Sequence, residues 1–359
     1  MPSVLILTAG YGEGHNAAAR GLHAACQQLG FDSDILDAFT ALPGYDRSRK
    51  DYLWLINTAP KIWAAIFGLI DKLPVVEFTL PLMRHVEAEL AKQLAERKPS
   101  AVVSVYPAYS YLLAKIYGNS RPFPLHTVVT DSITINRVWH RSPSDTYIVP
   151  NKASGDVMRA QGVPAQRIHE LGFPVPPRFA ADRPVRPDAS GGPRVLYMIN
   201  AGKDQAPGIV DRLLDVRGIH LTVTVGKDEE LRKKVEAAAR GRAVEIYGWT
   251  PNMPELLMTH HVLIGKAGGA AVQETIAAQT PMLITQVVPG QEEGNARLLF
   301  EQGCGALCPT ADSLARQIEW LFANDATEWR RWETNIRAIS RPDAALQIAK
   351  FVHAPLGDL

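Results

Sequence analysis

The stretch SVLILTAGYGEGHNAAARG, residues 3–21, joins a short apolar run to a glycine-rich turn and then to an alanine-rich segment. An apolar, β-branched run that ends in Gly10, Gly12 and Gly14 predicts a buried strand, a tight turn and the start of a helix. Such strand–turn–helix units build parallel sheets, in which ligands bind beyond the carboxyl ends of the strands. The stretch therefore predicts an α/β, doubly wound fold, and it raises the question of what His15 does at the start of the helix.

The same alternation of strands and helices recurs along the chain in two sets. The first set has expected strands at 4–9, 33–39, 101–106, 125–131 and 146–150 and helices at about 15–29, 84–97 and 108–117. The second has expected strands at 194–200, 220–226, 244–249, 261–269 and 281–286 and helices at about 207–216, 228–239, 271–279 and 293–302. Between them lies a proline-rich stretch, 173–193, which we interpret as an interdomain linker. The pattern predicts two Rossmann-like domains, with two helices at about 326–339 and 343–353 after the second sheet is complete.

Composition narrows the classes of function. The chain has 359 residues, 46% of them hydrophobic and 21% charged, with a net charge of +1, so we expect two globular domains and no nucleic acid partner. Three cysteines form neither a zinc motif nor a disulfide framework, and the N-terminus lacks the basic region of a signal peptide. No segment reaches the roughly 20 apolar residues that cross a bilayer. A cytoplasmic protein is expected.

His15 occupies the place of the third glycine in a dinucleotide fingerprint, G-x-G-x-x-G. Asp37 would satisfy the acidic requirement of that fingerprint, which keeps an NAD-dependent oxidoreductase as an alternative, but an imidazole suits the pyrophosphate poorly. Because a helix N-terminus disfavours a cation, we expect His15 to stay neutral and able to accept a proton. Asp131 ends another predicted strand at the same edge and could orient or charge-balance the imidazole, or simply form a turn.

A second glycine turn lies in GKAGGAAVQETIAAQTPMLI, residues 265–284. Gly268 and Gly269 separate a predicted strand from a predicted helix, so free backbone amides and the helix dipole can hold a phosphate group. Glu274 lies close enough along that helix to accept hydrogen bonds from ribose hydroxyls, although a solvated helix face would also explain it.

Other polar residues follow predicted strands of the second set. Gln291, Glu292 and Asn295 crowd into VPGQEEGN, residues 288–295, and suit a ligand with many hydroxyls; Asn295 could also be a helix cap. The turn in YGWTPNMPELL, residues 247–257, offers amides to a base edge, and Lys227 could meet a diphosphate.

Residues 52–83 are unusually apolar and interrupt the first domain. They could be a helical pair that completes the core, or an interfacial patch that contacts a membrane or an apolar substrate. Trp54 and Trp63 belong to this segment, and its prolines argue against a membrane span.

Taken together, GYGEGHNAAARGL, the stretch 265–284 and VPGQEEGN resemble the monogalactosyldiacylglycerol synthases and the bacterial diacylglycerol glucosyltransferases. These are relatives of the enzyme that adds N-acetylglucosamine to the lipid precursor of peptidoglycan. TVVTDSITINRVWH (127–140) and LGFPVPPRF (171–179) also resemble that group, so the similarity extends from residue 4 to about residue 310.

The resemblance implies the GT-B fold, in which two Rossmann-like domains face each other across a cleft. The acceptor domain would be 1–172, completed by a returning C-terminal helix at 336–359, and the UDP-sugar domain would be 194–335. The implied reaction is inverting transfer of galactose or glucose from UDP-galactose or UDP-glucose to the hydroxyl of diacylglycerol, with no cofactor and no obligatory metal. The implied location is peripheral, at the inner face of the membrane, with anionic lipids as candidate partners.

The resemblance also implies roles for individual residues. His15 would be the catalytic base, with Asp131 beside it. The acceptor-binding set comprises Gly12, Gly14, Trp54, Trp63 and Trp139. The donor-binding set comprises Lys227, Gly248, Trp249, Met253, Lys266, Gly268, Gly269, Ala270, Glu274, Gln291, Glu292 and Asn295, of which Gln291 and Glu292 would contact the hexose. Two alternatives remain: a soluble UDP-sugar 2-epimerase of the same architecture, and a non-catalytic lipid-binding protein.

Overall fold

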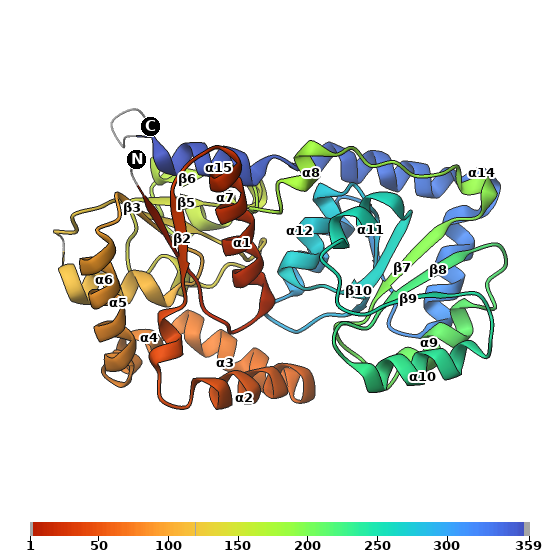
Figure 1. Ribbon diagram of the computed structural model, residues 1–359, viewed down its shortest axis with the longest axis horizontal. Helices are drawn as coiled ribbons and strands as arrows, with labels where there is room; N and C mark the ends of the chain where they lie inside the picture. The colour runs from red at the N-terminus through yellow and green to blue at the C-terminus, as the bar shows by residue number, and fades with distance from the viewer. Residues whose placement is uncertain (1–2, 119, 355–359) are drawn as a thin grey trace. The chain divides into compact units, whose positions relative to one another are not determined.

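Each half of the chain builds its own six-stranded parallel sheet in the computed structural model, which describes residues 3–118 and 120–354 (Figure 1). The first compact unit comprises Met1–Pro177, Val288–Gly294 and Asp343–Leu359, and the second comprises Arg178–Val287 and Asn295–Pro342. The predicted α/β class with two Rossmann-like domains is confirmed.

The sheet of the first unit has the order β2-β1-β3-β4-β5-β6. Its strands are β1 (Val4–Leu7), β2 (Ser33–Leu36), β3 (Ala101–Ser104), β4 (Leu125–Val128), β5 (Thr146–Ile148) and β6 (Ile168–His169). Its helices are α1 (Glu13–Gln28), α2 (Tyr45–Thr58), α3 (Pro60–Lys72), α4 (Val75–Thr79), α5 (Arg84–Arg97), α6 (Ala108–Tyr117), α7 (Lys152–Ala160) and α15 (Ala344–His353). All neighbouring strands run parallel, so the carboxyl ends of β1, β3 and β4 meet at one edge.

Two expectations for the first unit were incomplete. The strand expected at 33–39 ends at Leu36, because Asp37 caps a 3₁₀ turn by accepting a hydrogen bond from the amide of Phe39 (3.0 Å). The pair α7 and β6 was not predicted, and β6 has only two residues, too few for an apolar pattern. The helices expected at 84–97 and 108–117 are present with those bounds.

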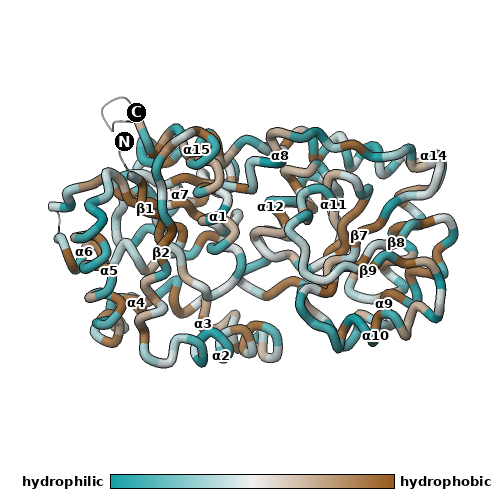
Figure 2. The backbone as a smooth tube through the Cα atoms, viewed as in Figure 1, coloured by the Kyte–Doolittle hydropathy of each residue, from teal (hydrophilic) through white to brown (hydrophobic). Residues whose placement is uncertain are grey.

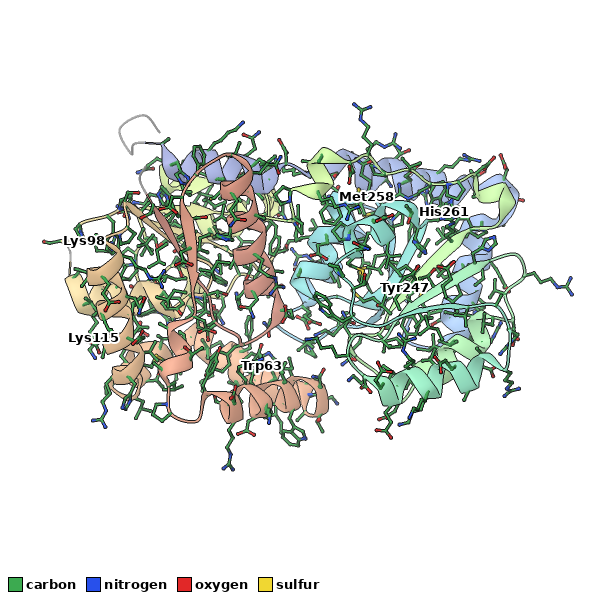
Figure 3. The ribbon with its side chains drawn as sticks, in the orientation of Figure 1. Trp63, Lys98, Lys115, Tyr247, Met258 and His261 are labelled. Carbon is green, nitrogen blue, oxygen red and sulfur yellow. The ribbon has the colours of Figure 1, made fainter. Side chains whose placement is uncertain are left out.

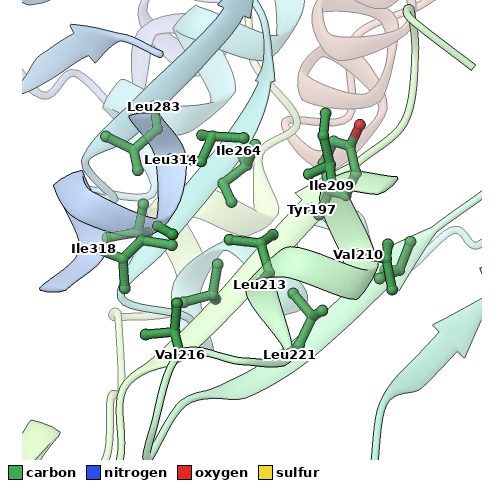
Figure 4. Packing of buried hydrophobic residues seen from close by; sticks show 14 of the residues in the cluster. Tyr197, Ile209, Val210, Leu213, Val216, Leu221, Ile264, Leu283, Leu314 and Ile318 are labelled. Atoms are coloured by element: carbon green, nitrogen blue, oxygen red, sulfur yellow. The ribbon is translucent and has the colours of Figure 1, made fainter. Parts of the chain in front are cut away.

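The sheet of the second unit has the order β12-β11-β10-β7-β8-β9. Its strands are β7 (Arg194–Met198), β8 (His220–Thr224), β9 (Glu245–Tyr247), β10 (Val262–Lys266), β11 (Met282–Gln286) and β12 (Gly305–Leu307). Its helices are α8 (Arg178–Ala181), α9 (Ala206–Leu213), α10 (Glu229–Ala239), α11 (Met253–Thr259), α12 (Gly269–Ala277) and α14 (Ala311–Ile339), while α13 (Glu293–Glu301) begins in the first unit and continues in the second. Figure 4 shows how apolar residues of α9 and α14 pack with those of the central strands to form its core.

The second unit has one strand more than expected, although its sheet is complete before residue 326, as predicted. β12 follows α13 and pairs with β11, adding an edge strand. α14 consists of two helical parts, because Asn324, Asp325 and Ala326 adopt the left-handed conformation, with φ values of 51°, 57° and 56°. The helix expected at 326–339 is therefore the second part of α14.

The domain boundaries also differ from the expected ones. Residues 288–294 belong to the first unit rather than the second, which itself extends to Pro342. The stretch 173–193 is not a free linker after residue 177, because Arg186 fastens it to the second unit through hydrogen bonds to the carbonyls of His260 and Ala278 (both 2.7 Å). α15, which starts at Ala344, packs against α1 in the first unit (Figure 1).

Candidate functional site

His15 lies in the first turn of α1, directly after the glycine turn. Gly12 precedes the helix with a φ of 116°, a conformation that favours glycine. His15 is buried, and its Nδ1 lies 2.7 Å from the carbonyl oxygen of Val105 and 3.2 Å from the Thr130 hydroxyl. Because a carbonyl oxygen only accepts hydrogen bonds, the proton resides on Nδ1 and the lone pair on Nε2.

The His15 imidazole is neutral at physiological pH. Burial lowers its pKa to about 4, and the hydrogen bond to Val105 opposes that shift only in part. The sequence predicted a neutral ring from the helix dipole, whereas burial is the larger cause in the structure.

Asp131 makes no hydrogen bond to His15 among the described residues. Its Oδ2 accepts a hydrogen bond of 2.7 Å from Nε1 of Trp139. The orienting role expected of Asp131 therefore belongs to Val105 and Thr130, and the other expected role, charge balance, remains a prediction. Burial raises the pKa of the Asp131 carboxyl to about 6.

Trp139, which was expected in the acceptor-binding set, is buried and donates a hydrogen bond to Asp131. Its side chain is 1% exposed, and the centroid of its ring lies 6.0 Å from that of His15. Gly12 and Gly14, by contrast, have nothing within 4 Å of the place where a Cβ would stand, so the turn before His15 is open on that side.

A cluster of aromatic side chains extends from His15 toward α2, and it was not predicted from the sequence. The ring of Tyr106 stands edge-on to the imidazole at 5.1 Å and stacks on Tyr11 at 6.1 Å. Tyr52 of α2 meets Tyr11 edge-on at 6.0 Å. The available signal was position: Tyr106 follows β3, so it lies at the same sheet edge as the turn after β1.

The helix pair α2 and α3 exposes apolar side chains, which bears on the two interpretations of residues 52–83. None of the α3 residues is buried, and brown hydrophobic sections recur along the pair in Figure 2. The exposed large apolar residues of the segment are Leu53, Trp54, Ile62, Ile66, Leu69, Leu73, Phe78 and Leu82. The segment therefore has an apolar outer surface, while Ile56 is buried and Ile70, Val76 and Leu80 pack against core clusters of the first unit.

The two tryptophans of this segment differ. Trp54 is 61% exposed, whereas Trp63 on α3 (Figure 3) is partly buried and packs edge-on against Tyr52 at 5.1 Å. No single helix in the described chain is long and apolar enough to cross a membrane. α2 and α3 together have the length and composition of one span but meet at a bend of 114°.

The second unit presents a phosphate-binding geometry at the start of α12. β10 ends at Lys266, Gly268 is the N-cap residue, and no side chain caps the helix by a hydrogen bond. The first-turn amides of Gly269 and Ala270 have no partner within the helix, because helix geometry leaves them without one. Together with the helix dipole they favour an anion.

Asn295 and Glu274 lie near this turn. Nδ2 of Asn295 donates to the carbonyl oxygen of Ala267 (3.1 Å), which fastens the side chain against the turn. Glu274 is partly buried on α12, five residues after Gly269. The structure thus brings the expected phosphate and ribose residues into one neighbourhood of the second unit.

A further group of expected donor residues follows β8 and β9. Nζ of Lys227 lies 5.7 Å from the centroid of the Trp249 ring, and Trp249 is 67% exposed. Gly248 precedes that tryptophan, and Met253 begins α11. A flat, exposed aromatic ring next to a cation suits a nucleobase and a phosphate.

Gln291 and Glu292 are placed differently from the expectation, because both belong to the first unit. The Tyr52 hydroxyl donates to Oε1 of Gln291 (3.1 Å). Oε2 of Glu292 accepts from the amide of Val288 (3.0 Å). In the described residues there is no group of three or more histidine, cysteine or acidic side chains that could hold a metal ion.

The fold has solved relatives. MurG from Acinetobacter baumannii superposes with a TM-score of 0.61 at 13% identity, covering 98% of this chain and 99% of that chain. A putative UDP-N-acetylglucosamine 2-epimerase from Listeria monocytogenes gives 0.64 at 12% identity, covering 98% and 96%. Together with the two parallel sheets, these likenesses define the GT-B fold, as predicted.

Sequence relatives narrow the class further. Residues 15–175 match the monogalactosyldiacylglycerol (MGDG) synthase family, and residues 202–345 match the glycosyltransferase family 28 C-terminal domain. The processive diacylglycerol beta-glucosyltransferase of Bacillus mycoides is 26% identical over 375 residues, 98% of this chain and 94% of that protein. Both halves of the chain thus match glycosyltransferase families, and the resemblance to the monogalactosyldiacylglycerol synthases and diacylglycerol glucosyltransferases is confirmed.

Proposed function

We propose that this protein transfers galactose or glucose from UDP-galactose or UDP-glucose to the hydroxyl of diacylglycerol, with inversion at the anomeric carbon. The observation that carries the proposal is the buried, neutral His15, whose Nδ1 hydrogen bond to Val105 leaves the Nε2 lone pair available. The relatives named above, which act on diacylglycerol, support the acceptor.

In the proposed reaction His15 is the general base. Its Nε2 takes the proton of the acceptor hydroxyl while that oxygen forms a bond to the anomeric carbon. The bond from the anomeric carbon to the diphosphate oxygen breaks, and UDP leaves with the electron pair from the opposite face. The negative charge of ionised Asp131 stabilises the imidazolium, which afterwards returns its proton to solvent.

The second unit binds the UDP-hexose donor in this proposal. The amides and dipole at the start of α12 offset the charge that develops on the leaving diphosphate. Glu274 accepts hydrogen bonds from the ribose, Asn295 lies near the diphosphate, and the exposed ring of Trp249 stacks on the uracil. No metal is assigned a step, and activity that persists in EDTA is the prediction that checks this.

We place the protein peripherally at the inner face of the membrane, and the exposed apolar residues of α2 and α3 support its contact with a lipid surface. Diacylglycerol resides in lipid, so an enzyme that uses it gains from exposed apolar side chains that enter the lipid surface. The mainly exposed ring of Trp54 is suited to that role.

The test is incubation of the protein with vesicles that contain diacylglycerol and with each UDP-hexose in turn. We expect a hexosyl lipid whose anomeric configuration, read by NMR, is opposite to that of the donor, and one equivalent of UDP. Epimerised nucleotide sugar formed without lipid would replace the proposal with a 2-epimerase. Binding of UDP-hexose and vesicles without any product would replace it with a non-catalytic lipid-binding protein.

A further inference from the structure

Residues 288–294, a tight loop and the first two residues of α13, belong to the first unit, and we refer to them together as the loop. The side chain and amide of Glu292 close it, since Oε2 accepts from the Val288 amide and the Glu292 amide donates to the Val288 carbonyl (both 3.0 Å). A Cβ on Gly294 would stand 1.8 Å from the carbonyl oxygen of Ser132, a distance that no side chain tolerates. The loop is therefore held by close backbone packing at its carboxyl end.

The other side of the loop rests on the apolar helix pair. Gly290 has a φ of 81°, and a Cβ on it would stand 3.1 Å from a ring carbon of Phe67 in α3. The backbone carbonyl of Phe67 in turn accepts a hydrogen bond from Nδ2 of Asn136 (2.9 Å). The position of α3 is thus tied both to the loop and to the segment that follows β4.

Tyr52 is the residue of α2 that makes a side-chain hydrogen bond to this loop. Its hydroxyl donates to Oε1 of Gln291, and its ring is held edge-on between Tyr11 and Trp63. Burial raises the pKa of the Tyr52 hydroxyl to about 12, so it remains a donor at every physiological pH. With its oxygen occupied, Gln291 keeps the two N–H donors of its amide for another partner.

We propose that Tyr52 is a positioning residue, which fixes the Gln291 amide so that its N–H groups are presented to a hydroxyl of the donor hexose. This inference rests on the proposed function and on the role that the family resemblance implies for Gln291, contact with the hexose. It assigns to α2 a part in donor recognition that is separate from its exposed apolar face.

The test compares Tyr52→Phe with Tyr11→Phe as a matched control. The Tyr11 hydroxyl bonds to Ser48, on the same helix α2, at 2.8 Å, so the control also loses one tyrosine hydroxyl but leaves the loop untouched. Affinities for UDP and for UDP-hexose are measured separately by calorimetry. Tyr52→Phe should weaken UDP-hexose binding by roughly 5- to 10-fold, as expected for one lost hydrogen bond, and leave UDP binding unchanged. Tyr11→Phe should change neither.

A double-mutant cycle with Gln291→Ala shows whether Tyr52 acts through Gln291. In the Gln291→Ala background, Tyr52→Phe should have no further effect on UDP-hexose affinity, and the KM for the donor should follow the affinity while kcat stays constant. Additive losses, or an equal loss for UDP and UDP-hexose, would overturn the inference, as would unchanged UDP-hexose binding in Tyr52→Phe. A wild-type protein that binds UDP-hexose but glycosylates no lipid would contradict the proposed function instead.

Discussion

The glycine turns before α1 and α12 have the same local structure, but only the first carries a functional side chain at the start of its helix. Each follows a strand of a parallel sheet and opens a helix with glycines at its start. In the first turn the third helical residue is His15, buried and bonded to Val105 from the end of a neighbouring strand. In the second turn the corresponding residues are Gly269, Ala270 and Ala271, none of which bears a functional side chain.

This difference shows how one supersecondary unit serves two kinds of chemistry. A helix start without functional side chains leaves its amides free, and amides with a positive dipole bind anions. A helix start that carries a buried imidazole, as α1 does, offers a neutral proton acceptor instead of an anion-binding site. Four predictions test this difference, in order of decreasing expected effect.

The largest effect is expected for His15→Ala. Turnover should fall by roughly 10²- to 10⁴-fold, as for loss of a general base, while the affinity for UDP stays unchanged. Single-turnover transfer to diacylglycerol and calorimetry with UDP measure the two quantities. His23→Ala is the matched control, because His23 lies on the same helix and bonds to Ser33 instead (2.9 Å). Equal turnover in His15→Ala and in the control would remove the distinction between the two turns.

Ala270→Asp tests the second turn. A carboxylate at the helix start should repel the diphosphate and occupy the free amides, lowering UDP affinity by about 10- to 100-fold. Ala270→Asn has nearly the same shape and no charge, so it should lower the affinity much less. If the two variants bind UDP equally weakly, steric exclusion and not charge causes the loss of affinity. The assignment of an anion site to the start of α12 is then wrong.

Trp54→Ser separates the lipid-facing surface from the catalytic turn. Because Trp54 is 61% exposed, its loss should reduce partitioning into diacylglycerol vesicles by roughly 10-fold and leave the melting temperature unchanged. The partly buried Trp63 should behave in the opposite way, since Trp63→Ser removes packing against Tyr52. Co-sedimentation with vesicles and thermal unfolding provide the two readouts, and a melting temperature lowered by Trp54→Ser would assign that ring to the core.

The smallest effect is expected for the stability of Asp131→Asn. Burial raises the pKa of Asp131 to about 6, so the folded state loses stability as pH rises from about 4 through 6 and the carboxyl ionises. The amide avoids that cost and can still accept from Trp139. We expect a free energy of unfolding about 1 to 2 kcal/mol higher than wild type at pH 8, a gain that disappears below about pH 4. Chemical denaturation at several pH values measures it, and a gain independent of pH would contradict the electrostatic origin.

Much of the fold followed from local patterns. The helix at 84–97 matches because Val86, Leu90 and Leu94 recur every four residues on its buried face, and the helix at 108–117 matches because Pro107 and Gly118 mark its ends. β6 and β12, with two and three residues, carry no periodic signal and are defined only by pairing with β5 and β11. The expected strand at 33–39 ended early at Asp37, where a side-chain cap outweighed β propensity.

The candidate site was predictable in part. His15 and the Gly268–Ala270 turn were found because each interrupts a strand–helix pattern at a defined point. Val105, Thr130 and Tyr106 were missed, because they lie about 90 to 115 residues from His15 in the chain and meet it only when β1, β3 and β4 align.

The sequence by itself determined the two parallel sheets, the two glycine turns, the family resemblance and the neutrality expected of His15. Only the tertiary structure decided which group orients that histidine, that α3 exposes its apolar residues, and that residues 288–294 join the first unit through Tyr52 and Gln291, 239 positions apart. The physical reason is how far apart in the sequence the interacting residues lie. Periodicity and turn chemistry act over a few residues, whereas hydrogen bonds and burial depend on how distant segments pack.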